Sequence, residues 1–120
     1  MRMAHTILVA EDNFIAGVDL RDTCEEAGYT VEGPHTGLNS AMLALQKTRP
    51  DLAIVDVGGD GKAALALADR LACENVPIIF QSVSAWPDHF SGRFPTALAL
   101  PKPCPPAHMI ATIERLLAQR

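Results

Sequence analysis

Short apolar runs recur along this chain and are separated by longer stretches with helical spacing. Five runs predict strands, at residues 6–10, 29–32, 52–57, 76–81 and 97–100. The central run, around Leu52-Ala-Ile-Val55, has no polar alternation and is partly β-branched. This pattern is typical of a strand that is buried on both faces of a parallel sheet.

Between the strands, apolar side chains repeat at the spacing of one helix face. The four predicted stripes are Phe14, Val18, Leu20, Cys24 and Ala27; Leu38, Ala41, Met42 and Leu45; Ala64, Leu67, Ala68 and Leu71; and Met109, Ile110, Ile113, Leu116 and Leu117. Gly28 is placed to end the first helix and Pro50 the second, while Pro105 and Pro106 are placed to open the last.

Repeated strand-then-helix order predicts an α/β fold with a parallel sheet and helices on both of its faces. The segment 83–95 breaks the rhythm, because Pro87, Gly92 and Pro95 interrupt any helical period. We therefore expect a fourth helix that is short or irregular. The aromatic residues Trp86 and Phe90 in this segment either cover an edge of the core or contact a partner.

Composition limits the possible classes of protein. The chain has 120 residues, enough for one domain over residues 1–120. It is 48% hydrophobic and carries a net charge of −4, which disfavours nucleic acid and anionic membranes as partners. We find no membrane-spanning run and no signal-peptide core. The three isolated cysteines predict reduced thiols and a cytoplasmic location.

Polar side chains follow four of the predicted strands. Glu11 and Asp12 come after the first strand, Asp56 at the end of the third, Ser82 after the fourth and Lys102 after the fifth. The carboxyl ends of parallel strands meet at one edge of a sheet. Three carboxylates at one edge repel one another, so we expect a hard divalent cation such as Mg²⁺ and the lysine to balance their charge.

Each of these residues also has a simpler interpretation. The acidic pair could serve only as a helix cap, Lys102 could be a solvated surface lysine, and Ser82 could bond the backbone. Together, a carboxylate nucleophile, Mg²⁺, a lysine and a hydroxyl are the parts needed for phosphoryl transfer onto Asp56.

This arrangement resembles the receiver domain of two-component response regulators, and the match covers essentially the whole chain. The resemblance implies a flavodoxin-like, doubly wound sheet with the strand order 2-1-3-4-5. It implies Asp56 as the phosphoacceptor, Ser82 as the switch hydroxyl and Lys102 as the lysine that binds the phosphoryl group. The Lys102–Pro103 peptide bond is then expected to be cis.

The resemblance also implies a metal site for Mg²⁺. Its ligands would be Glu11, Asp12, Asp56 and the main-chain carbonyl of Gly58, two residues beyond the phosphoacceptor. The implied partners are a histidine kinase or a phosphotransfer protein, and a downstream protein of unknown identity.

Three motifs look most like an alphaproteobacterial branch with a Phe-Ala-Thr-Gly-Tyr-type signature. They are Ala-Glu-Asp-Asn-Phe at residues 10–14, Asp-Val-Gly-Gly-Asp-Gly at 56–61 and Pro-Ile-Ile-Phe at 77–80. Here the signature itself would read Phe-Gln-Ser-Val-Ser at 80–84. The chain departs from the family at Val83 and at Ala99, which replaces an aromatic switch. The stretch Leu-Pro-Lys-Pro-Cys at 100–104 also carries an extra proline and lacks the usual phenylalanine after the motif.

Three functions remain open on these residues. The first is a stand-alone response regulator that accepts a phosphoryl group on Asp56 and signals by changed protein binding. Such a protein is not an enzyme beyond slow self-dephosphorylation. The second is a binding module of the same fold that no longer depends on phosphorylation. The third, an Asp-nucleophile phosphohydrolase, is disfavoured because Gly58 replaces its usual second aspartate.

Without an aromatic at position 99, the signal needs another route. The segment 83–95 directly follows Ser82 and has few residues that favour regular structure. We therefore predict that phosphoryl contact with Ser82 biases this segment between a mobile and an ordered state.

Overall fold

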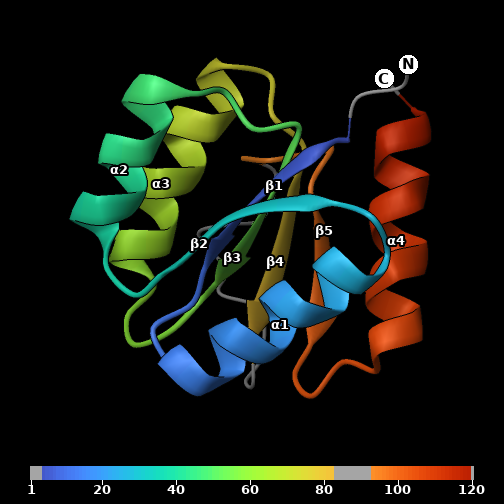
Figure 1. The fold of residues 1–120 in the computed structure, drawn as a ribbon. Coiled ribbons are helices and arrows are strands. Elements are labelled where there is room, and N and C mark those ends of the chain that lie inside the picture. The colour runs from blue at the N-terminus through green and yellow to red at the C-terminus, as the bar shows by residue number, and fades with distance from the viewer. Residues whose placement is uncertain (1–3, 83–92, 120) are drawn as a thin grey trace.

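The computed structural model describes residues 4–82 and 93–119, which form one five-stranded parallel sheet (Figure 1). The strand order is β2-β1-β3-β4-β5, as predicted. The strands are β1 (Thr6–Ala10), β2 (Thr30–His35), β3 (Leu52–Asp56), β4 (Ile78–Ser82) and β5 (Leu98–Pro101). Strand β3 lies in the middle of the sheet, so both of its long edges are paired.

Four helices in the described residues cover the two faces of the sheet. They are α1 (Phe14–Glu26), α2 (Leu38–Lys47), α3 (Lys62–Cys73) and α4 (Pro106–Ala118). Figure 1 shows α2 and α3 on one side of the sheet and α1 and α4 on the other. No described helix is long and apolar enough to cross a membrane.

The sheet separates two apolar cores, as the uninterrupted apolar strands predict. Phe80 and Leu71 belong to the core under α2 and α3, whereas Ile79 and Ile113 belong to the core under α1 and α4. Successive residues of β4 therefore point to opposite faces and are buried on both. This explains why the central strands are apolar without alternation.

Strand β2 runs further than the sequence indicated. The predicted strand ended at Glu32, but β2 continues to His35 through a cis Gly33–Pro34 bond. A proline is tolerated here because β2 is an edge strand, where a missing N–H disrupts no second partner. The pairing register with β1 shifts at this point, between Leu8 and Ala10.

The helix ends follow the predicted signals. Gly28 adopts a φ of 96°, which suits the turn after α1, and Pro106 occupies the first turn of α4. Helix α1 is capped by Asn13, whose side-chain oxygen accepts from the N–H of Ala16 at 3.0 Å. The acidic pair before it therefore does not provide this cap, which leaves Glu11 and Asp12 available for another role.

Most of the segment that breaks the strand–helix rhythm lies outside the described residues. Residues 83–92, with Trp86, Phe90 and the signature positions Val83 and Ser84, are not described. The predicted irregular helix and the predicted order–disorder switch therefore stay predictions. Beyond this gap, Phe94 packs against Phe80 with ring centroids 5.6 Å apart.

Helix α1 approaches β2 closely at one glycine. A Cβ atom placed on Gly17 would lie 2.6 Å from Cβ of Pro34, well inside van der Waals contact. It would also lie 3.5 Å from Cβ of Glu11. Only glycine at position 17 allows the helix to pack this closely against Pro34 of the edge strand and against Glu11.

We expect Gly17→Ala to destabilise the fold although alanine favours helices. Relief of the clash requires movement of α1 or β2, at a cost of about 1–3 kcal/mol, which exceeds the gain of about 1 kcal/mol in helix propensity. Chemical denaturation measures the change. Asp19→Ala, at an exposed position of the same helix, is the control and should change the unfolding free energy little. Equal stability of the two variants would contradict the close packing.

Candidate functional site

The predicted site residues meet at the carboxyl edge of the sheet. Ala10 at the end of β1 pairs with Val55 of β3, and Asp56 of β3 pairs with Gln81 of β4. Glu11 follows Ala10 directly and therefore lies beside Asp56. The parallel register alone brings these two carboxylates together from positions 45 residues apart in the sequence.

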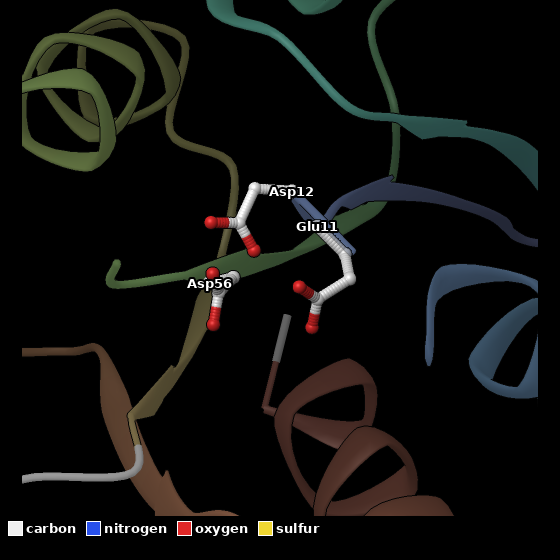
Figure 2. A group of neighbouring side chains, drawn as sticks. All are labelled: Glu11, Asp12 and Asp56. Carbon is white, nitrogen blue, oxygen red and sulfur yellow. The ribbon is translucent and has the colours of Figure 1, made fainter. Parts of the chain in front are cut away.

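Three carboxylates form one cluster at this edge. One oxygen from each of Glu11, Asp12 and Asp56 lies within 4.8 Å of the other two. Figure 2 shows the three side chains around a common space, with Asp12 above Asp56 and Glu11 on the right. Glu11 is buried, Asp56 is partly buried and Asp12 is exposed.

Lys102 supplies a positive charge to this cluster. Its Nζ lies 2.7 Å from Oδ1 of Asp56 and also forms a short ion pair with Oε1 of Glu11. The Lys102–Pro103 peptide bond is cis, as the resemblance implied. The lysine thus joins the two most buried carboxylates, while Asp12 has no ion pair among residues 4–82 and 93–119.

Burial and mutual repulsion change the proton affinities of the cluster. Desolvation raises the pKa of Glu11 and that of Asp56, and the bonds from Lys102 oppose this in each case without cancelling it. Hydrogen bonds with Glu11 and Asp56 lower the pKa of Asp12. Burial acts to lower the pKa of Lys102, but its two carboxylate partners outweigh burial and raise it.

Gly58 lies directly against the cluster. A Cβ atom at this position would meet Oδ2 of Asp12 at 3.0 Å and Oδ2 of Asp56 at 3.1 Å, so glycine leaves room between them. The carbonyl of Gly58 accepts a hydrogen bond from the N–H of Gly61 at 3.0 Å. A carbonyl oxygen has a second lone pair, so this bond is compatible with the predicted metal ligation.

Ser82 ends β4 on the strand next to Asp56. Its residue is 7% exposed, and its carbonyl accepts from the N–H of Lys102 at 3.0 Å. On β5, Ala99 pairs with Phe80 and is exposed, so no ring stands at the position of the aromatic switch. The backbone of Ser82 thus holds the backbone of Lys102 in place.

His35 is a neighbour of the site that the sequence analysis left without a role. It lines a cavity of about 100 Å³ together with Glu11, Asp12 and Asp56, and its carbonyl accepts from the N–H of Glu11 at 2.9 Å. Its ring nitrogens lie 3.0 Å from Oε2 of Glu32 and 2.9 Å from Oγ of Ser40. These contacts hold the β2–α2 connection beside the acidic cluster. The sequence analysis missed His35 because it predicted that the second strand would end at Glu32, before this residue.

The donor set fits Mg²⁺. It consists of carboxylate oxygens and one available carbonyl, which are the ligands that a hard divalent cation prefers, and it contains no sulfur or ring nitrogen. The three clustered carboxylates share one lysine, which leaves excess negative charge at a partly open site. The residues present therefore suit a cation that keeps several of its waters.

Comparison with known proteins agrees with this geometry. No family model matches the chain. It is 34% identical over 120 residues to the phyllosphere-induced regulator PhyR of Methylorubrum extorquens, and the match covers 96% of this chain but 44% of that regulator. The chain therefore spans less than half of that curated relative.

Solved structures supply a match over the full length. The signal receiver domain of a modulated diguanylate cyclase from Desulfovibrio desulfuricans is 30% identical, with a TM-score of 0.85, 98% of this chain covered and 96% of the other. The receiver domain of the PhyR response regulator from Erythrobacter litoralis, at 23% identity, 96% and 91% coverage and a TM-score of 0.80, shares the fold.

The sheet order, the strand-end site and these matches define the class of protein. The chain belongs to the signal receiver domains of two-component response regulators. Its similarity to PhyR from an alphaproteobacterium agrees with the predicted branch. The signature at residues 80–84 runs into the part that is not described and stays a prediction.

We expect Asp12→Ala to weaken Mg²⁺ binding more than any other single change in the cluster. Asp12 is the exposed carboxylate with no lysine partner, so its charge is the most available to a cation. Isothermal calorimetry of the metal-free protein measures the affinity, with Asp60→Ala as the control at an exposed acid of the next turn. Unchanged affinity in Asp12→Ala would contradict the assignment.

The metal-free protein should lose the stabilising contribution of this site as the pH rises. Folding raises the pKa of Glu11 and that of Asp56. Each of these groups therefore contributes its full share to the free energy of unfolding below its unfolded pKa, and this share is lost as the pH rises through the folded pKa. The pKa of Asp12 is lowered, so its contribution to stability changes with pH in the opposite direction. Because Asp12 is exposed, solvent screens this contribution.

The test compares wild type with Asp56→Asn, which removes one of the two carboxyl groups whose pKa is raised. Unfolding free energies at about pH 4.5 and about pH 7.5, without metal, should show that wild type loses stability relative to the variant. Mg²⁺ should reverse this trend, because it binds the ionised carboxylates. A wild-type-minus-variant difference that is independent of pH would contradict the raised pKa of Asp56.

Proposed function

We propose that residues 1–120 act as a cytoplasmic receiver that accepts a phosphoryl group on Asp56 from a histidine kinase or a phosphotransfer protein. One observation carries this proposal. Lys102 forms ion pairs with Asp56 and with Glu11, and the neighbouring Asp12 has no ion pair in the described part of the chain. This is the charge arrangement that stabilises a transferring phosphoryl group.

In the proposed reaction, an Oδ atom of Asp56 attacks the phosphorus of a phosphohistidine. The phosphorus–nitrogen bond breaks and its electron pair returns to the histidine ring. Glu11, Asp12 and the carbonyl of Gly58 would hold Mg²⁺ together with Asp56. When bound, the cation would offset negative charge on the phosphoryl oxygens.

Lys102 and Ser82 have separate tasks in this proposal. The Nζ of Lys102 exchanges one carboxylate oxygen for a phosphoryl oxygen and so keeps an ion pair throughout the transfer. The hydroxyl of Ser82, on the adjacent strand, donates to a second phosphoryl oxygen. Because the backbone of Ser82 accepts from the N–H of Lys102, a shift at either residue reaches the other.

The output of the proposed protein is changed binding to a downstream protein. Ala99 carries no ring, so the signal does not pass through an aromatic on β5. Each molecule accepts one phosphoryl group on Asp56. The group is then lost only by slow hydrolysis.

One observation favours a second candidate function, a receiver-like module that binds its partner without phosphorylation. Lys102 already forms ion pairs with both Asp56 and Glu11 without an added group. A site held together by these ion pairs can serve stability alone. The third candidate, an Asp-nucleophile phosphohydrolase, would need a second acid at position 58, where a side chain would crowd Asp12 and Asp56.

We expect one phosphoryl group to be added to the protein by acetyl phosphate and Mg²⁺, and none to Asp56→Asn. Asparagine keeps the shape of the side chain but lacks the nucleophilic oxygen pair. Intact-mass spectrometry detects the adduct, and Asp60→Asn, a nearby exposed acid, is the matched control that should still accept it. A histidine kinase donor then tests the partner.

The outcomes separate the three functions. A lasting adduct that depends on Asp56 supports the receiver. A folded protein that binds Mg²⁺ but takes up no phosphoryl group from either donor indicates the phosphorylation-independent module. Rapid multiple turnover of the donor indicates a hydrolase. An adduct of full yield in Asp56→Asn would mean that another residue is the acceptor.

A further inference from the structure

A second concave site lies on the α1 and α4 side of the sheet. It is a groove of about 550 Å³ that runs between these two helices and reaches the loop after β5. We call it the α1–α4 groove; the residues that matter here are Ala16, Leu20, Gln81, Cys104 and Met109. Its volume falls within the range of about 300–1,000 Å³ of small-molecule sites.

Several of the side chains that line the groove are small. Ala16 and Thr23 lie on the face of α1 that borders it, and Cys104 occupies the loop before α4. Helix α1 packs mainly against β2, where Gly17 permits close contact, and touches α4 little. The pull of α1 toward the edge strand therefore leaves space on its other side.

The floor of the groove contains a polar group that the fold does not use. Gln81 is 7% exposed and lies on β4 two residues after Ile79. It points to the same face as Ile79, which belongs to the apolar core under α1 and α4. No residue in 4–82 or 93–119 hydrogen-bonds its side-chain amide, which reaches the groove that it lines.

The amide of Gln81 is open to the groove. No described residue has a buried side-chain nitrogen or oxygen without a partner, so the amide atoms of Gln81 are reached by solvent from the groove. The neighbouring lining residues Leu20 and Met109 are apolar, so a ligand with a matching polar edge would replace water at the amide with direct hydrogen bonds while its body covers apolar surface.

We propose that the α1–α4 groove binds a flat, mostly apolar small molecule that carries adjacent donor and acceptor atoms, as in a lactam or a nucleobase edge. The amide of Gln81 would donate to the acceptor and accept from the donor of that edge. The body of the molecule would lie between Leu20 of α1 and Met109 of α4. A short neutral edge of this kind is the smallest group that satisfies both halves of a carboxamide.

The α1–α4 groove is separate from the phosphoacceptor but shares two residues with its surroundings. Glu11 and Lys102 line one end of the groove, whereas Asp56 does not line it. An occupant of the groove would therefore lie next to the lysine that neutralises Asp56. The proposal does not depend on phosphorylation, since the binding site is complete without it.

The experiment uses 2-quinolone as the probe and N-methyl-2-quinolone as its matched comparator, which keeps the acceptor but lacks the donor. Binding is followed by the side-chain amide signals of Gln81 and the methyl signals of Leu20 and Met109 in NMR titrations, without Mg²⁺ or phosphodonor. We expect 2-quinolone to shift these signals and to bind roughly tenfold more tightly than the N-methyl compound.

The variant Gln81→Leu completes a double-difference measurement. Leucine has a similar size and suits the apolar face, so the variant should fold, and it should bind both compounds with equal affinity. Gln46→Leu, at an exposed position of α2 on the other face, is the control and should keep the preference for 2-quinolone.

Two results would overturn the proposal. One is equal affinity of wild type for the two compounds, which would show apolar partitioning without recognition by the amide. The other is the absence of shifts at Leu20, Gln81 and Met109 while the protein remains folded. The comparison of the two compounds on wild type is decisive even if Gln81→Leu does not fold. Either failure leaves the role of Asp56 untouched, because no phosphoryl chemistry enters the test.

Discussion

The ion pairs of Lys102 with Glu11 and Asp56 are the interaction on which the site depends. Parallel strands place their carboxyl ends at one edge, so this fold forces the two acids together while burying Glu11 and partly burying Asp56. Desolvation raises their pKa, and the lysine opposes the rise. Removal of the lysine would leave a buried and a partly buried carboxylate without a cation, which is more costly than loss of a surface pair.

The same charge balance explains how the site can be both stable and reactive. The lysine neutralises only part of the cluster, because Asp12 stands at the exposed side without an ion pair in the described part of the chain. This residual negative charge favours a divalent cation. Gly58 keeps the space between Asp12 and Asp56 free of side-chain atoms, so a metal and an incoming phosphoryl group have room to approach.

Helix α1 lies between the acidic site and the proposed ligand site. Gly17 lets α1 pack closely against Pro34 at the edge of the sheet, and position 17 also lies near Cβ of Glu11. The α1–α4 groove lies along another side of α1, over Gln81. One helix thus borders both the acidic site and the proposed ligand site.

The sequence by itself determined the fold class, the strand order through the family resemblance, and the residues that meet at the strand ends. Those predictions rest on strong local signals: apolar strands such as β3, glycine after α1, prolines before α4, and acids placed directly after strands. The positions of Glu11, Asp56 and Lys102 follow from these signals because parallel pairing leaves little freedom at the edge of a sheet.

Only the tertiary structure decided the remaining features. The extension of β2 through Pro34 depends on its place at the edge, which no local pattern reveals. The role of His35 beside the acidic cluster follows from that extension. The exposed amide edge of Gln81 depends on which helices flank β4 and on how large their side chains are. Each of these is a property of contacts between segments far apart in the chain, and local sequence carries no direct record of such contacts.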